Sequence, residues 1–133
     1  MRLVNYGTGE IVDRLTILSL KELYGAQASR DITHFRNERN VLLTQLHARD
    51  AYARWYEHGL ALHAVNAALW QAEDELRWYR TEFGPIEDRT LAGDLEPVVV
   101  CAFRIQALND RRAELIAAIN ASVGDPSGQE KIT

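Results

Sequence analysis

The stretch Leu60–Phe83, LALHAVNAALWQAEDELRWYRTEF, decides the fold class. Its apolar residues recur every three, four or seven positions, which is the spacing of one face of an α-helix. They are Leu62, Val65, Leu69 and Leu76. Gly84 and Pro85 follow directly, and this pair stops a helix. The stretch therefore predicts a long amphipathic helix over residues 60–83.

Two segments before this stretch also have helical spacing. The first begins at Thr8, whose hydroxyl we expect to cap the first turn, and ends before Gly25, which suits the left-handed position past a helix end. The second covers about residues 29 or 31 to 49. The aromatic residues 51–58 are predicted either as a short helix or as the lead-in to the helix over 60–83.

A last helix is predicted from Pro97, placed in the first turn, to Ser122, with Gly124 ending it. Its apolar stripe consists of Val98, Cys101, Ile105, Leu108, Leu115 and Ile119. The run Val98–Val100 also suits a strand, but no partner strand of comparable strength exists, so we predict helix.

No segment alternates with period two over a useful length. The sequence therefore predicts an all-α fold, an antiparallel bundle of about four helices. The 133 residues are enough for one domain, expected over residues 1–133, with residues 122–133 as a flexible tail.

Composition narrows the possible partners. The net charge of −4 argues against binding a nucleic-acid polymer, but it leaves room for a small anionic ligand held by a few arginines. Cys101 is the single cysteine and has no disulfide partner within the chain. No signal-peptide pattern and no apolar run of membrane-spanning length occur, so we expect a cytoplasmic protein without a membrane partner.

Three of the predicted helices carry a polar stripe beside the apolar one. The first stripe is Glu10, Asp13, Arg14 and Lys21, the second is Asn66, Trp70, Glu73, Asp74 and Arg77, and the third is Asn109, Arg112 and Asn120. Each stripe alone is compatible with a solvated helix face, since i, i+4 pairs of opposite charge support exposed helices. Mid-helix asparagine is unfavourable on such a face, and tryptophan prefers a half-buried place.

We therefore interpret the three stripes as the walls of one polar cleft, whose twelve residues are candidate ligand contacts. Arg14, Lys21, Arg77 and Arg112 would hold phosphate or carboxylate, and Trp70 would stack on a flat ring. The asparagines and the acidic residues would form hydrogen bonds with hydroxyl and amino groups of the ligand. The alternative is a closed network of salt bridges without a ligand.

Cofactors and assembly give weaker signals. We predict no cofactor and no metal, although Glu10 with Asp13, or Glu73 with Asp74, would hold Mg²⁺ if the protein were an enzyme. No convincing serine or cysteine nucleophile set is present. Aromatic residues exceed the needs of one small core, which favours a homo-oligomer, a dimer first. They are Tyr52, Trp55, Tyr56, Trp78 and Tyr79.

Four blocks of the chain resemble a family of small, uncharacterised bacterial and phage proteins of unknown function, often encoded near glycosyltransferase genes. The blocks are GEIVDRLTILSLK, VNAALWQAEDELR, ALNDRRAELIAAIN and the closing QEKIT. Residues matching the family pattern are Gly9, Glu10, Asp13, Thr16, Lys21, Asn66, Trp70, Glu73, Asp74, Arg77, Asn109, Asp110, Arg112, Asn120, Glu130 and Lys131. Arg14 stands where the family commonly has lysine, and Ile132 and Thr133 stand where it usually has an aromatic residue. The resemblance implies which residues matter and brings no established activity.

Three hypotheses of function follow. The first is a non-enzymatic binder of a small anionic ligand, nucleotide-like or sugar-phosphate-like. With the phage members of the family in view, it would be a sponge that sequesters a nucleotide immune signal. The second is a Mg²⁺-dependent enzyme acting on a nucleotide or nucleotide sugar. The third is a structural or adaptor protein whose stripes form salt bridges at an interface with a partner.

Overall fold

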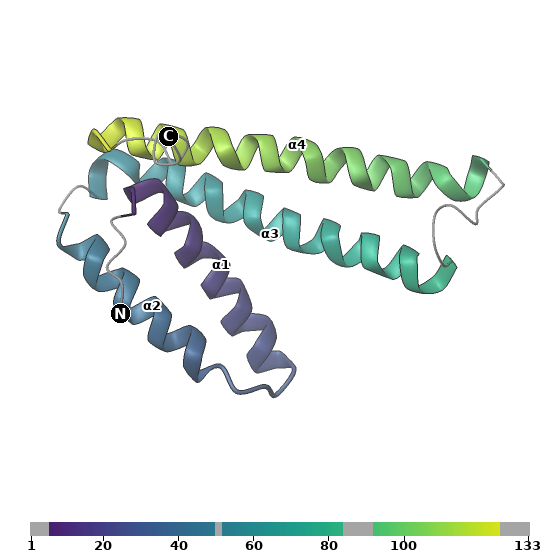
Figure 1. Ribbon diagram of the computed structural model, residues 1–133, viewed down its shortest axis with the longest axis horizontal. Coiled ribbons are helices and arrows are strands. Elements are labelled where there is room, and N and C mark those ends of the chain that lie inside the picture. The colour runs from purple at the N-terminus through teal and green to yellow at the C-terminus, as the bar shows by residue number, and fades with distance from the viewer. Residues whose placement is uncertain (1–5, 50–51, 84–91, 126–133) are drawn as a thin grey trace.

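Four helices make up the structure, a computed structural model that describes residues 6–49, 52–83 and 92–125. They are α1 (Thr8–Gln27), α2 (Thr33–His47), α3 (Tyr52–Phe83) and α4 (Ala92–Val123). α1 and α2 form one antiparallel pair, and α3 and α4 form a longer one (Figure 1). No strand occurs in these ranges, so the predicted all-α, antiparallel four-helix architecture is confirmed.

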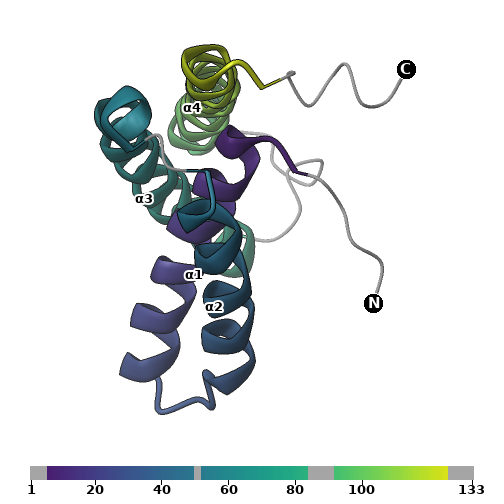
Figure 2. The same ribbon diagram turned by 90° about the vertical axis from the view of Figure 1, so that its left-hand side faces the viewer.

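The two helix pairs cross instead of lying parallel. α1 and α2 meet the long pair near one of its ends, and the other end of α3 and α4 extends past them (Figures 1 and 2). α1 is central, because it contacts α2, α3 and α4. The three helices with polar stripes therefore meet along α1.

The core lies where α1 crosses α3 and α4. Its most buried side chains are at most 1% exposed, and they are Ile11, Leu18, Leu62, Leu115 and Ile119. α2 adds Leu42 and Leu46 to the same cluster. Each such side chain contributes roughly 1.5–3 kcal/mol by leaving water. The apolar stripes predicted for residues 60–83 and 97–122 thus form the buried faces of α3 and α4.

The start of α1 differs from the prediction. Gly7 is the capping residue and Thr8 is already helical, so the Thr8 hydroxyl does not cap its own helix. Two side chains of the α4 end do so instead: Thr8 N donates to Asp125 Oδ2 at 2.8 Å, and Gly9 N donates to Asn120 Oδ1 at 2.7 Å. A cap supplied from more than a hundred residues away leaves no local sequence signal.

Helix ends depend on two left-handed residues. α1 continues through Gly25 to Gln27, so the prediction that Gly25 lies past its end is wrong. The left-handed residue is Ser29, with φ of 57°. Arg30 N donates to Gly25 O at 2.9 Å, which closes the helix. Gly124 has φ of 77° and ends α4, as predicted.

The starts of α2, α3 and α4 also differ from the predicted positions. α2 begins only at Thr33, since the Asp31 carboxylate accepts hydrogen bonds from Thr33 N and Oγ1 and holds the chain in a turn. α3 begins at Tyr52 and includes the aromatic lead-in.

α4 begins at Ala92, so Pro97 lies inside the helix and not in its first turn. Proline inside a helix removes one backbone hydrogen bond and crowds the carbonyl four residues earlier. The neighbouring Val98 is only 3% exposed, so packing supports this turn. The helical prediction for residues 98–100 is confirmed.

Part of the predicted tail belongs to α4 and its cap, since residues 122–125 are described there. Residues 126–133, with Glu130 and Lys131, lie outside the described residues. Within the described ranges, none of the helices combines the length and the apolar character that crossing a membrane requires.

Candidate functional site

The carboxylate of Asp13 lies where three helices meet. Arg112 on α4 donates from Nε to Asp13 Oδ1 at 2.8 Å and from Nη2 to Oδ2 at 2.6 Å. Asn66 on α3 donates from Nδ2 to Asp13 Oδ1 at 2.9 Å. One member of each polar stripe therefore meets at a single carboxylate.

Thr16 completes this arrangement, which we call the Asp13 cluster (Asp13, Thr16, Asn66 and Arg112). Asn66 Nδ2 donates to Thr16 Oγ1 at 2.7 Å, and Thr16 Oγ1 donates to the Asp13 carbonyl at 2.7 Å. Asp13 and Asn66 are only 7% and 4% exposed. The mid-helix asparagine is thus explained by a buried carboxylate that needs a donor.

Electrostatics tie Arg112 to this cluster. The pKa of its guanidinium is raised, first by the hydrogen bonds to Asp13 and further by the charges of Asp13 and Glu73, which together outweigh the lowering effect of burial. Glu73 is itself exposed and acts on Arg112 through its charge. Arg112 is therefore positively charged, and its charge is already paired with the carboxylate of Asp13.

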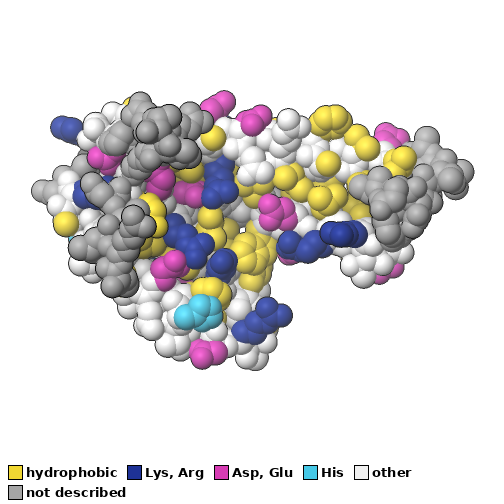
Figure 3. All heavy atoms as spheres, in the orientation of Figure 1, with side chains coloured by type: hydrophobic (Ala, Val, Ile, Leu, Met, Phe, Trp, Pro, Cys, Tyr) yellow, Lys and Arg dark blue, Asp and Glu magenta, His cyan; other side chains and the backbone are white. Residues whose placement is uncertain are grey.

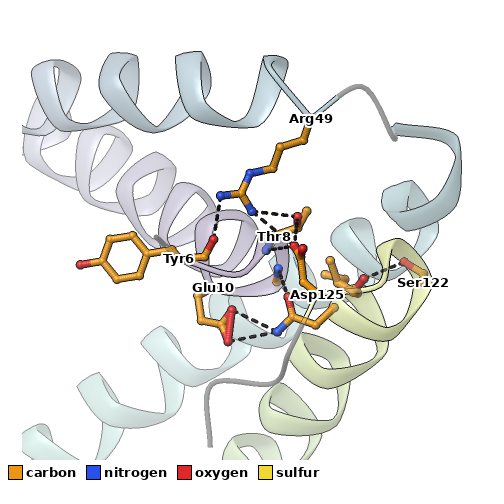
Figure 4. A network of polar contacts seen from close by, with 9 residues as sticks. Tyr6, Thr8, Glu10, Arg49, Ser122 and Asp125 are labelled. Carbon is orange, nitrogen blue, oxygen red and sulfur yellow. Dashed lines mark hydrogen bonds and ion pairs between the residues drawn. The ribbon is translucent and has the colours of Figure 1, made fainter. Parts of the chain in front are cut away.

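A second polar cluster surrounds the start of α1 (Figure 4). Asn120 Nδ2 donates to both Glu10 carboxylate oxygens at 3.0 Å, while its Oδ1 accepts from Gly9 N. Arg49, just past α2, donates to Thr8 Oγ1 at 3.1 Å and to Asp125 Oδ2 at 3.3 Å. The predicted site residues Glu10 and Asn120 are brought together here to join α1 to α4.

Arg14 turns away from α3 and α4. Its guanidinium forms a two-pronged ion pair with Glu38 of α2, with a shortest distance of 2.9 Å. Both side chains are about two-fifths exposed, at 41% and 42%. The sequence places Arg14 beside Asp13 but does not reveal that α2 supplies its partner.

An open pocket of about 400 Å³ lies where α1, the α1–α2 turn and α3 face one another. We call it the Lys21 pocket. It is lined by Lys21, Tyr24, Gly25, Ala28, Arg30, Asp31, His34, Phe35, Trp70 and Asp74. Three predicted site residues, Lys21, Trp70 and Asp74, therefore share one pocket. Figure 3 shows Lys, Arg, Asp and Glu side chains gathered around apolar surface on the hollowed face between the two helix pairs.

Aromatic rings form much of the pocket wall. Tyr24 of α1 stacks on Trp70 of α3, with ring centroids 5.0 Å apart and planes 19° apart. The Lys21 Nζ atom lies 5.4 Å from the centroid of the Phe35 ring. Trp70 is half-buried against an aromatic partner, which explains its place in a polar stripe.

The remaining predicted residues lie at the margins. Arg77 pairs with Asp74 one turn away on the exposed face of α3. Asn109 is exposed on α4, and no described residue makes a polar contact with it. The single cleft predicted from the stripes is therefore divided into a closed part, around Asp13 and Glu10, and an open part at Lys21.

Sequence reasoning missed seven lining residues, of which four have a ring or a positive charge, namely Tyr24, Arg30, His34 and Phe35. Tyr24 lies three residues after Lys21 on the same helix side, and that spacing was a usable signal. The other three come from the α1–α2 turn and the start of α2. Their contribution depends on how this helix pair folds back, which the helical pattern does not reveal.

A second pocket of about 400 Å³ lies between α1, α2 and α3 and has a different character. Leucine, valine and aromatic side chains form most of its lining, and neither Lys nor Arg contributes. It does not suit an anion. Among the described residues, no group of three or more His, Cys, Asp or Glu side chains is placed to hold a metal ion.

Comparison of the chain with protein families, with curated proteins and with solved structures finds no match.

Proposed function

We propose that this protein binds a small anionic ligand, nucleotide-like or sugar-phosphate-like, in the Lys21 pocket and does not transform it. One observation carries the proposal. Three of the four cations in the polar stripes, Arg14, Arg77 and Arg112, pair with a carboxylate. Lys21 is half-buried and has no carboxylate partner among the described residues.

Arg30 adds a second cation without a carboxylate partner in the described part of the chain, and it lines the same pocket. Cations that lack a carboxylate partner favour an anion such as phosphate or carboxylate. The pocket volume of about 400 Å³ falls in the range of small-molecule sites. Charge, size and wall chemistry therefore support the same class of ligand.

The biological form of this proposal is a sponge that sequesters a nucleotide immune signal. It rests in addition on the proposed kinship with the bacterial and phage family that the four sequence blocks resemble. The lining of the Lys21 pocket offers cations, aromatic rings, His34 and two exposed acids, and the cations and rings suit binding by charge and stacking.

Titration calorimetry tests the proposal with a panel of AMP, UDP-glucose, glucose 6-phosphate and inorganic phosphate. We expect at least one ligand to bind, with affinity falling about tenfold in Lys21→Ala, since a charge-assisted contact is lost. Arg111→Ala is the matched control, because it removes an exposed cation paired with Glu114 on α4. No heat and no thermal shift with any panel member would overturn the proposal.

The enzyme alternative is distinguished by recovering the ligand. Intact ligand released from the denatured complex supports a binder, whereas Mg²⁺-dependent conversion that is lost in Glu73→Gln supports an enzyme. In the described structure, Asp13 and Glu10 already accept hydrogen bonds from Arg112, Asn66 and Asn120, so a Mg²⁺ ion would compete with these donors.

A structural or adaptor role is the second candidate. It is favoured by apolar side chains on α4 that the α1–α2 pair does not cover, with Val100 60% and Phe103 66% exposed. The homodimer predicted from the surplus of aromatic residues is compatible with this candidate and with the binder. Light scattering on the wild type and on Phe103→Glu tests it: a dimer converted to a monomer supports assembly through this face, and a wild-type monomer contradicts it.

A further inference from the structure

The walls of the Lys21 pocket differ from one side to the other. Tyr24 and Trp70 present a stacked aromatic pair, while Lys21 and Arg30 supply positive charge. Asp74 adds a carboxylate. A sugar phosphate would use mainly the cations and the acid. The aromatic pair, which also packs α1 against α3, offers the best match to a ligand that carries a flat ring.

We propose that the ligand is a nucleotide whose base extends the Tyr24–Trp70 stack while its phosphate lies against Lys21 and Arg30. This inference rests on the proposed function and narrows its ligand class. Bases stack on aromatic side chains in nucleic-acid-binding proteins. A mononucleotide suits a pocket of about 400 Å³, which holds one base, one sugar and a phosphate.

Tyr24 and Trp70 already form a ring stack of the kind that aromatic ligands extend. Its two planes are 19° apart with centroids 5.0 Å apart, which is an offset parallel arrangement. Both residues line the pocket, so the stacked pair forms part of its wall, and a ring bound in the pocket would meet aromatic surface there.

The cationic side is built by the turn between α1 and α2. Ser29 adopts φ of 57°, and Arg30 N then bonds back to Gly25 O. This fixes the backbone of Arg30 directly after the end of α1. Lys21 lies two turns earlier on α1, over the Phe35 ring. A phosphate between the two cations would replace water around Lys21 with a paired charge.

Asp74 gives the pocket a means to distinguish bases. Its Oδ1 accepts from Arg77, and its Oδ2 accepts no hydrogen bond from any described residue. A carboxylate oxygen accepts from the exocyclic amino group of adenine, guanine or cytosine. Uracil offers only its ring N3–H, whose two flanking carbonyl oxygens repel a carboxylate, so Asp74 disfavours uracil. Asp31 is less available, because its Oδ1 accepts two hydrogen bonds from Thr33.

The chain supplies its own reporter, since Trp70 is one of three tryptophans. Trp55→Phe with Trp78→Phe leaves Trp70 as the sole indole. We expect AMP to quench its fluorescence in the titration and ribose 5-phosphate, the same molecule without a base, to bind about tenfold or more weakly. Wild-type calorimetry with both ligands gives the same comparison without mutation.

Matched variants locate the base. Trp70→Leu is expected to weaken AMP binding about tenfold and to leave ribose 5-phosphate nearly unchanged, while Trp78→Leu, outside the pocket, changes neither. Asp74→Asn is expected to reduce the preference for AMP over UMP. An equal effect of Asp74→Asn on both nucleotides would overturn base reading by Asp74.

The outcomes separate this inference from the proposed function. Equal affinity for AMP and ribose 5-phosphate, both lost in Lys21→Ala, overturns base stacking and leaves the anion-binding function standing. Binding of neither compound, nor of any member of the calorimetry panel, overturns both. Tighter binding of AMP together with Trp70 quenching supports the nucleotide.

Discussion

Asp13 of α1 and Arg112 of α4 form a two-pronged ion pair, 99 positions apart in the chain, with N–O distances of 2.8 and 2.6 Å. The pair links the second turn of the central helix to the long α3–α4 pair, and Asn66 adds a third helix. It also uses two of the twelve residues that the sequence analysis named as candidate ligand contacts. The middle of the predicted polar cleft is therefore closed by the protein's own side chains.

Removing either member of this pair is expected to destabilise the fold. Arg112→Ala leaves the buried Asp13 carboxylate without its cation and should cost about 2 kcal/mol in the free energy of unfolding. Asp13→Ala should cost a similar amount. The double variant should cost less than the sum, by about 1 kcal/mol or more, since the two residues interact directly. Urea unfolding of all four proteins measures this, and strict additivity would contradict the pairing.

Close approach of α1 to α4 requires glycine at position 9. A Cβ atom built on Gly9 would lie 2.4 Å from the Ile116 carbonyl oxygen, so the helices must separate. Gly9→Ala is expected to cost about 3 kcal/mol by overpacking. Gly59→Ala is the matched control, since its nearest neighbour is the Trp55 ring at 3.0 Å, a side chain that can shift. Thermal unfolding should therefore show a far larger loss for Gly9→Ala, and equal losses would argue against backbone contact.

Substitutions at Ser29 and Gly124, the two residues with a left-handed backbone, are expected to change the free energy of unfolding in opposite directions. Gly124→Ala forces a side chain into φ of 77° and should destabilise the end of α4 by about 1 kcal/mol. Ser29→Gly relieves φ of 57° and should stabilise the α1–α2 turn by about 0.5 kcal/mol. Chemical denaturation measures both, and a loss in Ser29→Gly would contradict the assignment of that turn.

Cys101 is expected to be unreactive in the native protein. Burial raises the pKa of its thiol, and its Sγ–H donates to the Ala72 carbonyl at 3.2 Å. A raised pKa means less thiolate at pH 8, and the thiolate is the reactive species. A colorimetric disulfide reagent should modify the native thiol many times more slowly than the urea-unfolded thiol. Rapid modification at pH 8 without denaturant would place Cys101 at the surface.

Local patterns predicted the helices well, but not the contacts between distant helix ends. The apolar stripe over residues 60–83 and the terminating Gly124 depend on neighbours within a few turns, and both predictions are confirmed. The caps of α1 come from Asn120 and Asp125 at the far end of the chain. The residues around Thr8 in the sequence favour Thr8 as the cap, and they contain no signal that Asp125 supplies the capping group instead.

The polar stripes identified residues that do converge, but their individual roles depended on packing. Asp13, Asn66 and Arg112 meet as expected from their helix faces. Whether they bind a ligand or one another depends on how closely α1 approaches α4, and periodicity carries no information on that distance. The sequence pattern also does not predict the path of the α1–α2 turn. Arg30 and His34 were therefore not among the predicted site residues, although both line the Lys21 pocket.

The most direct measurement of the central claim is a nuclear magnetic resonance titration of the ¹⁵N-labelled protein with AMP. The account predicts that the largest shifts occur at the Trp70 indole N–H and at the backbone amides of Lys21, Tyr24 and Arg30, all in the Lys21 pocket. Signals near Asp13 and Arg112 should change little, because that pair is closed. The largest shifts at the Asp13 cluster, or no shift at millimolar AMP, would contradict the account.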